Sequence, residues 1–117
     1  PEKKLRKQIM SIKTDSTPLE EPKDTKTDTI FALYKLLASK NQVAEMKIKY
    51  KGGNYGYGHA KQELHELILD KFSVAREQYS HYMSHKNEID QILELGAEKA
   101  RKVAREVLDR VRKKIGY

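Results

Sequence analysis

The chain has 117 residues, of which 38% are hydrophobic and 35% charged, and its formal net charge is +7. It has no cysteine, which excludes disulfides, thiolate metal sites and a cysteine nucleophile. No apolar stretch approaches the roughly 20 residues of a membrane-spanning helix and the charged N-terminus lacks the apolar core of a secretory signal, so we expect a cytoplasmic protein without a membrane partner.

The N-terminal segment carries apolar residues at helical spacing. Leu5 and Ile9 stand four residues apart among lysines, which predicts a short amphipathic helix over residues 2–12. The polar stretch that follows contains Pro18 and Pro22. Proline pushes the residue before it out of the helical region, so this stretch is predicted to be a loop.

Two helices are predicted between residues 28 and 52. Asp28 or Thr27 can cap the first by accepting a hydrogen bond from a free backbone amide, and Asn41 can cap the second. The first is apolar nearly all round, which places it at the centre of a bundle. Glycine adopts the conformation that ends many helices, so Gly52 and Gly53 are expected to end the second.

The longest helical pattern runs from about residue 59 to residue 83, with apolar residues recurring at threes and fours. Asn87 can start a short helix that Gly96 ends, and a final helix follows. No segment alternates with a period of two, so the predicted fold class is all-α, a bundle of about five to six helices. The predicted division is a helix and turn at residues 1–17, a linker loop at residues 18–27 and a helical domain at residues 28–117.

The glycine-rich turn at residues 52–58 leads into a helix, as phosphate-binding loops do. It follows a helix rather than a strand, however, and it lacks the Gly-Lys-Ser/Thr sequence of such loops. We interpret it as a helix–turn–helix connection. The alternative is that Tyr55 and Tyr57 stack on bases beside Lys49 and Lys51, because aromatic rings paired with cations suit single-stranded RNA.

Metal and catalytic sites are not predicted. His81 and His85 stand four residues apart, a spacing that can place two imidazoles on one metal ion. The residues between them lack the glutamate of a zinc peptidase motif, so we interpret both as solvated helix-end histidines and assign no metal. No serine lies in a recognisable nucleophile setting, so the chain alone is not predicted to be an enzyme.

The last predicted helix is the strongest electrostatic feature. A basic helix face can follow a phosphate backbone, because each neutralised phosphate releases counterions. The alternative is a solvated outer face, partly paired with acidic residues four positions away. The candidate RNA-binding residues come from the glycine-rich turn and from this last helix. They are Lys51, Tyr55, Arg101, Lys102 and Arg105.

Four stretches resemble, in the same order, the region that follows the KMSKS loop in bacterial-type tryptophanyl-tRNA synthetases. They are KKLRKQIMSIKTDST at 3–17, FALYKLL at 31–37, YKGGNYGYGHAK at 50–61 and GAEKARKVAREVLD at 96–109. The resemblance implies a class I ligase that activates tryptophan with ATP and Mg²⁺, transfers it to its tRNA and works as a homodimer. The catalytic domain of that family bears HIGH-like and KMSKS motifs, and neither motif is present here.

The resemblance therefore implies no catalytic or cofactor-binding residue in this chain. It implies a C-terminal helical domain that contacts the anticodon end of the tRNA, with residues 1–17 forming the junction to the missing catalytic domain. An apolar face, left without that neighbour, is expected to be exposed on the first helix. The alternatives are a free-standing basic helical module that binds RNA and a module that binds a protein partner.

Overall fold

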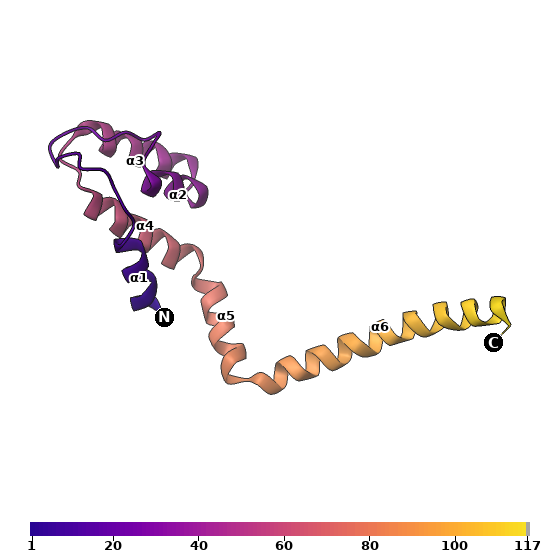
Figure 1. The fold of residues 1–117 in the computed structure, drawn as a ribbon. Coiled ribbons are helices and arrows are strands. Elements are labelled where there is room, and N and C mark those ends of the chain that lie inside the picture. The colour runs from indigo at the N-terminus through magenta and orange to yellow at the C-terminus, as the bar shows by residue number, and fades with distance from the viewer. Residues whose placement is uncertain (117) are drawn as a thin grey trace. The chain divides into compact units, whose positions relative to one another are not determined.

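The computed structural model describes residues 1–116. Within them the chain forms six helices and no strand, which confirms the all-α fold class (Figure 1). The helices are α1 (Glu2–Met10), α2 (Thr29–Leu37), α3 (Lys40–Gly52), α4 (Tyr57–Lys71), α5 (Ser73–Ser84) and α6 (Lys86–Ile115). The chain divides into two compact units, Pro1–Ser73 and Val74–Tyr117. None of the six helices is long and apolar enough to cross a membrane.

The first unit holds α1 to α4 around a small hydrophobic core. α4 packs against both α1 and α2, and α2 packs against α3. Tyr50, Ile30, Met46 and Leu64 are fully buried in this core. Ile9 of α1 is also buried, because α4 covers the apolar side of α1. The expectation of an exposed apolar face on the first helix is therefore wrong.

α2 begins at the predicted cap. One carboxylate oxygen of Asp28, Oδ2, accepts a hydrogen bond from the backbone N–H of Phe31 at 2.8 Å, as expected of a helix-capping residue. The same oxygen accepts a second bond from the hydroxyl of Tyr50 at 2.7 Å. Although α2 is apolar on most sides, Leu36 is 79% exposed, so only one face of α2 lies in the core.

The ends of α3 follow from local chemistry. Ser39, rather than the predicted Asn41, caps the helix: its Oγ accepts from the backbone N–H of Gln42, and the Gln42 side chain accepts from the backbone N–H of Ser39. This reciprocal capping box satisfies two amides that the first turn leaves free. The helix ends at Gly52, where the glycine stop was predicted. Gly53 has a φ of 71° and a ψ of 177°, so its φ is positive but its conformation is not the left-handed helical one.

The loop between α1 and α2, which includes the predicted linker at residues 18–27, packs against the helices. The backbone N–H of Lys23 donates to the carbonyl oxygen of Tyr50 at 2.8 Å. The ammonium group of Lys23 donates to the Pro18 carbonyl at 3.2 Å and lies 5.1 Å from the centre of the Tyr57 ring. Tyr57 in turn donates to Asp15 Oδ1 at 2.7 Å. The predicted linker is thus loop in structure, but it lies inside the first compact unit.

The C-terminal helices differ from prediction in two places. The chain breaks at Phe72, whose φ is −105° and ψ 15°, so the pattern over residues 59–83 forms two helices. α6, in contrast, is a single helix of 30 residues that passes through Gly96, where a break was predicted. Glycine inside a helix costs only about 1 kcal/mol, so it does not stop a helix whose other residues favour it. No described residue of α5 or α6 is buried: a few are half-buried and all the others are exposed.

Candidate nucleic-acid interface

A basic depression lies in the first unit, where the loop before α2 meets α2 and α3. Its volume is about 670 Å³. Four exposed lysines line it, namely Lys26, Lys35, Lys47 and Lys51. We call the depression with these four side chains the lysine pocket. Four ammonium groups around one hollow attract a polyanion by their combined field.

Three elements bring these lysines together. Lys47 and Lys51 stand four residues apart in α3, a spacing that puts both on one side of the helix. Lys35 belongs to the last turn of α2. Lys26 belongs to the loop before α2, where its backbone N–H donates to Asp24 Oδ1 at 2.9 Å.

Asp24 carries the one carboxylate among the described residues of the pocket lining. The hydrogen bond from the backbone N–H of Lys26, followed by the bond from the Thr27 hydroxyl, lowers the pKa of Asp24. This carboxylate is therefore ionised at neutral pH and offsets part of the lysine charge. The positive charges still outnumber it, which suits the pocket to a phosphate group.

Lys23 also lines the depression, but its role is structural. It is 4% exposed, and its ammonium group is taken up by backbone carbonyls and the Tyr57 ring. A lysine can bury its aliphatic stem in this way when its charged end finds acceptors. We therefore leave Lys23 out of the lysine pocket.

Tyr55 already has neighbours within the protein. Its ring centre lies 5.8 Å from that of Tyr50 and 5.9 Å from that of His59, and its hydroxyl contacts Met46 Sδ at 3.4 Å. Burial raises the pKa of the Tyr55 hydroxyl. These contacts explain the tyrosine without RNA, so stacking of Tyr55 on a base stays a prediction.

Lys49, whose ammonium group lies beside the Tyr55 ring, forms an ion pair with Glu63. Its Nζ lies 2.6 Å from Glu63 Oε1. That hydrogen bond is the main reason why the pKa of Lys49 is raised. Lys49 therefore links α3 to α4, whereas Lys51 remains exposed in the lysine pocket.

The three candidate residues of α6 share one side of that helix. Arg101, Lys102 and Arg105 are all exposed, and they lie around a shallow depression together with three acidic residues, Glu98, Glu106 and Asp109. Positive and negative side chains are thus equal in number on this side of the helix. This balance favours the solvated-face alternative over a strong phosphate-binding surface.

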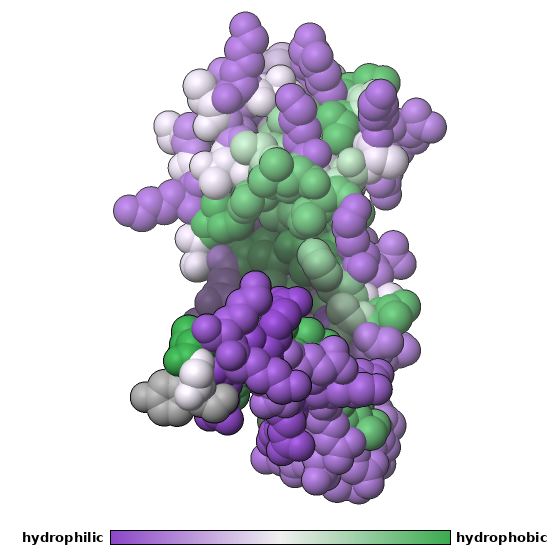
Figure 2. Space-filling view, turned by 90° about the vertical axis from the view of Figure 1, so that its right-hand side faces the viewer, coloured by the Kyte–Doolittle hydropathy of each residue, from purple (hydrophilic) through white to green (hydrophobic). Residues whose placement is uncertain are grey.

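The C-terminal turns of α6 are more basic. Arg112, Lys113 and Lys114 fall in the last turn, and Figure 2 shows a hydrophilic surface around this end of the helix. Cations at a helix C-terminus are stabilised by the helix dipole. The dipole therefore provides a structural reason for this charge, independent of any nucleic acid.

One of the five candidate RNA-binding residues lines the lysine pocket. Lys51 lies in the lysine pocket, but Tyr55 is not among the residues that line it. Arg101, Lys102 and Arg105 belong to the other compact unit. Lys26, Lys35 and Lys47 also line the lysine pocket but were not among the candidates, although the spacing of Lys47 and Lys51 on a predicted helix was a usable signal.

Known proteins are similar to this chain in sequence. It is 44% identical over 115 residues to the tryptophan–tRNA ligase of Campylobacter jejuni (strain RM1221), in an alignment that covers 98% of the chain. It is 43% identical over 114 residues to the tryptophan–tRNA ligase of Rhodopirellula baltica, with 97% of the chain covered. The chain belongs to the tryptophan–tRNA ligase family. No protein-family model matches it.

The chain spans about 36% of the length of these tryptophan–tRNA ligases. It corresponds to their C-terminal helical part, which confirms the resemblance found in the four sequence stretches. The tryptophanyl-tRNA synthetase from Campylobacter jejuni, solved in complex with ADP and tryptophan, matches the fold with a TM-score of 0.94 at 44% identity. That match covers 100% of this chain and 37% of the solved one.

Proposed function

We propose that this chain is the tRNA-contacting helical part of a tryptophan–tRNA ligase and that it holds the anticodon end of the tRNA. The observation that carries the proposal is the lysine pocket, a hollow lined by four exposed cations in a chain of this family. Exposed ammonium groups bind phosphates mainly by releasing counterions, so affinity for RNA should fall as salt rises.

The chemistry of the whole ligase belongs to the remainder of the protein. The proposed reaction activates tryptophan with ATP and Mg²⁺ and transfers it to tRNA for protein biosynthesis in the cytoplasm. The ADP and tryptophan held by the solved Campylobacter jejuni enzyme support the nucleotide and the amino acid. The role assigned to residues 1–117 is to orient the tRNA, and no catalytic residue is assigned to them.

The second compact unit supports a partner inside the same protein. α5 and α6 expose a long series of apolar side chains, including Ile92, Val103, Val107, Val111 and Ile115. A helix with an apolar stripe gains most of its stability by packing that stripe against another element. We propose that the N-terminal catalytic domain covers this stripe and that the intact ligase is a homodimer.

The test of the proposed tRNA contact is a charge reversal in the lysine pocket. The variant carrying Lys47→Glu and Lys51→Glu should bind the tryptophan tRNA more weakly than the unchanged protein. Each lost phosphate contact removes about 0.7 from the slope of log affinity against log salt. The slope should therefore flatten by about 1.4 for two contacts. Fluorescence anisotropy with labelled tRNA at several salt concentrations measures both quantities.

A matched control separates a specific contact from a loss of net charge. Lys4→Glu with Lys7→Glu makes the same charge change on α1, outside the lysine pocket. If the two double variants lose equal affinity and equal slope, the lysine pocket is not the tRNA-binding surface. Arg101→Glu with Arg105→Glu applies the same test to α6, and an unchanged slope would remove that face from the interface.

The exposed stripe of α5 and α6 also favours a second candidate, a module that binds a protein partner without RNA. Absence of tRNA binding at low salt, together with self-association of the chain, would support this function instead.

A further inference from the structure

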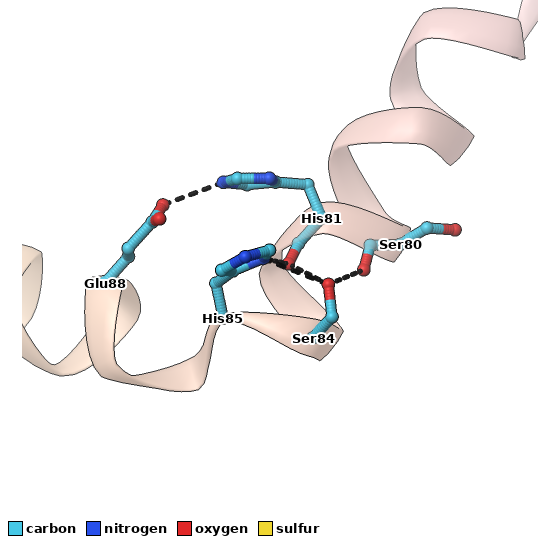
Figure 3. Close-up of polar contacts among 5 residues, drawn as sticks. All are labelled: Ser80, His81, Ser84, His85 and Glu88. Atoms are coloured by element: carbon cyan, nitrogen blue, oxygen red, sulfur yellow. Dashed lines mark hydrogen bonds and ion pairs between the residues drawn. The ribbon is translucent and has the colours of Figure 1, made fainter.

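The break between α5 and α6 brings together two imidazoles and one carboxylate, which are groups able to bind a metal ion. α5 ends at Ser84 and α6 begins at Lys86, with His85 between them at a φ of −125° and a ψ of 58°. Seven residues of continuous α-helix would rise about 10.5 Å. Because the chain turns at His85, Glu88 instead reaches back to His81, and Nε2 of His81 lies 2.8 Å from Glu88 Oε2 (Figure 3).

His85 completes the group. Its ring stacks on that of His81, with ring centres 4.5 Å apart and an angle of 21° between the planes. One nitrogen or oxygen atom from each of His81, His85 and Glu88 lies within 4.8 Å of the other two. Ligands of a tetrahedral zinc ion stand about 3.3 Å apart, given bonds of about 2.0–2.1 Å. Small side-chain rotations therefore suffice to bring these atoms onto one ion.

The hydrogen bonds prepare His85 for a metal. Nδ1 of His85 lies 2.9 Å from the backbone carbonyl oxygen of His81. A carbonyl only accepts, so Nδ1 carries the hydrogen, and Nε2 of the neutral ring keeps a free lone pair. Histidines that bind metals usually donate their other ring N–H to a carbonyl or a carboxylate in this way.

We propose that His81, His85 and Glu88 bind a zinc ion at the α5–α6 break. Two imidazoles and one carboxylate are a ligand set that zinc accepts, with water in the fourth position. In the metal-free protein Nε2 of His81 is hydrogen-bonded to the Glu88 carboxylate. On zinc binding the hydrogen of the neutral His81 ring lies on Nδ1, so that Nε2 and the carboxylate both offer lone pairs to the ion. None of the three residues belongs to the surfaces proposed to contact tRNA.

The bound ion would fix the direction of α6 relative to α5. Its ligands come from the last turn of α5, from the residue between the helices and from the first turn of α6. The break otherwise depends on hydrogen bonds among exposed groups, such as Ser84 Oγ to the Ser80 carbonyl at 3.0 Å. A zinc ion held from both sides would therefore slow local opening of the break.

Zinc titration of the 117-residue chain tests the site. Competition with a chromophoric zinc chelator should show one ion bound per chain. His81→Ala and Glu88→Gln should each weaken binding by about tenfold or more, by analogy with the loss that follows changes around metal sites. His59→Ala is the control, because His59 is an exposed histidine of α4 outside the proposed site. The His59→Ala variant should bind zinc as tightly as the unchanged protein does.

Amide hydrogen exchange gives a second measurement, in which slower exchange on adding zinc cannot be produced by a loss of helix. Zinc should slow amide exchange around residues 81–90 in the unchanged protein and in His59→Ala, but not in His81→Ala or Glu88→Gln. The proposal is overturned if zinc does not slow this exchange in the protein without substitutions. It is equally overturned if His59→Ala lowers the affinity for zinc as much as His81→Ala does.

Discussion

At the scale of single residues, Asp28 joins helix capping to core packing. Its carboxylate accepts from the Phe31 backbone and from the hydroxyl of Tyr50, a residue that is 1% exposed. Burial, followed by the bond to Asp28, raises the pKa of Tyr50, so its hydroxyl stays protonated and continues to donate. The cap of α2 thereby also supplies the acceptor for a polar atom in the core.

Removal of this carboxylate should destabilise the first unit more than loss of a helix cap alone. Asp28→Ala loses the cap, worth about 1 kcal/mol, and leaves the Tyr50 hydroxyl unpaired, which costs about 1–3 kcal/mol. The free energy of unfolding should therefore fall by about 2–4 kcal/mol. Urea unfolding followed by the near-ultraviolet signal of the tyrosines measures this change.

Two further variants test the explanation. Asp28→Asn keeps an oxygen acceptor and should lose less stability than Asp28→Ala. Asp70→Ala removes an exposed carboxylate from the last turn of α4, where the helix dipole disfavours negative charge, so it should not destabilise. Equal losses in Asp28→Ala and Asp70→Ala would contradict the role given to Asp28.

At the scale of helices, local chemistry predicted some of the starts and stops. Asp28 and Gly53 were found because capping and glycine stops depend on neighbouring residues alone. The break at Phe72 was missed because the apolar pattern continues through it without glycine or proline. The helix end predicted at Gly96 was wrong, because the cost of one glycine is smaller than the helix-forming tendency of the other residues in a 30-residue helix.

Two glycines with opposite surroundings give opposite predictions. Gly53 has a φ of 71° and a ψ of 177°, a region open essentially to glycine alone, and a Cβ there would collide with the Glu20 carbonyl oxygen. Gly53→Ala should therefore destabilise the first unit by about 1–3 kcal/mol. Gly96 lies inside α6 with open space around it, so Gly96→Ala should stabilise that helix by about 0.5–1 kcal/mol.

Circular dichroism at 222 nm during heating measures both effects. The expected result is an earlier transition for Gly53→Ala and higher helix content for Gly96→Ala. A loss of helix in Gly96→Ala would show that the helix needs glycine at that position, contrary to its open surroundings.

At the scale of the whole chain, the sequence predicted the fold class and the family, whereas of the four lysines in the lysine pocket it pointed only to Lys51. Periodicity gives helices, and four short stretches gave the family, because both are local properties of the sequence. The lysine pocket is assembled from a loop and two helices, so only the folded chain places Lys26 and Lys35 beside Lys51. Glu88 joins the histidine pair for the same reason, through a turn that no local pattern predicts.

The two units differ in burial, because the first has a hydrophobic core and no described residue of α5 or α6 is buried. The first unit encloses its apolar residues, including Ile30 and Leu64. The second unit exposes its apolar stripe, and the chain spans only about 36% of its relatives. An isolated chain should thus be most stable in residues 1–73, and the proposed partner of α5 and α6 lies in the rest of the ligase.

We propose that this chain contacts the anticodon end of a tryptophan-accepting tRNA. The most direct measurement compares its affinity for that tRNA with its affinity for the same tRNA carrying a different anticodon, at one fixed salt concentration. We expect clearly tighter binding to the tRNA with the native anticodon and a loss of that difference in the Lys47→Glu, Lys51→Glu variant. Equal affinity for the two tRNAs would contradict this proposal.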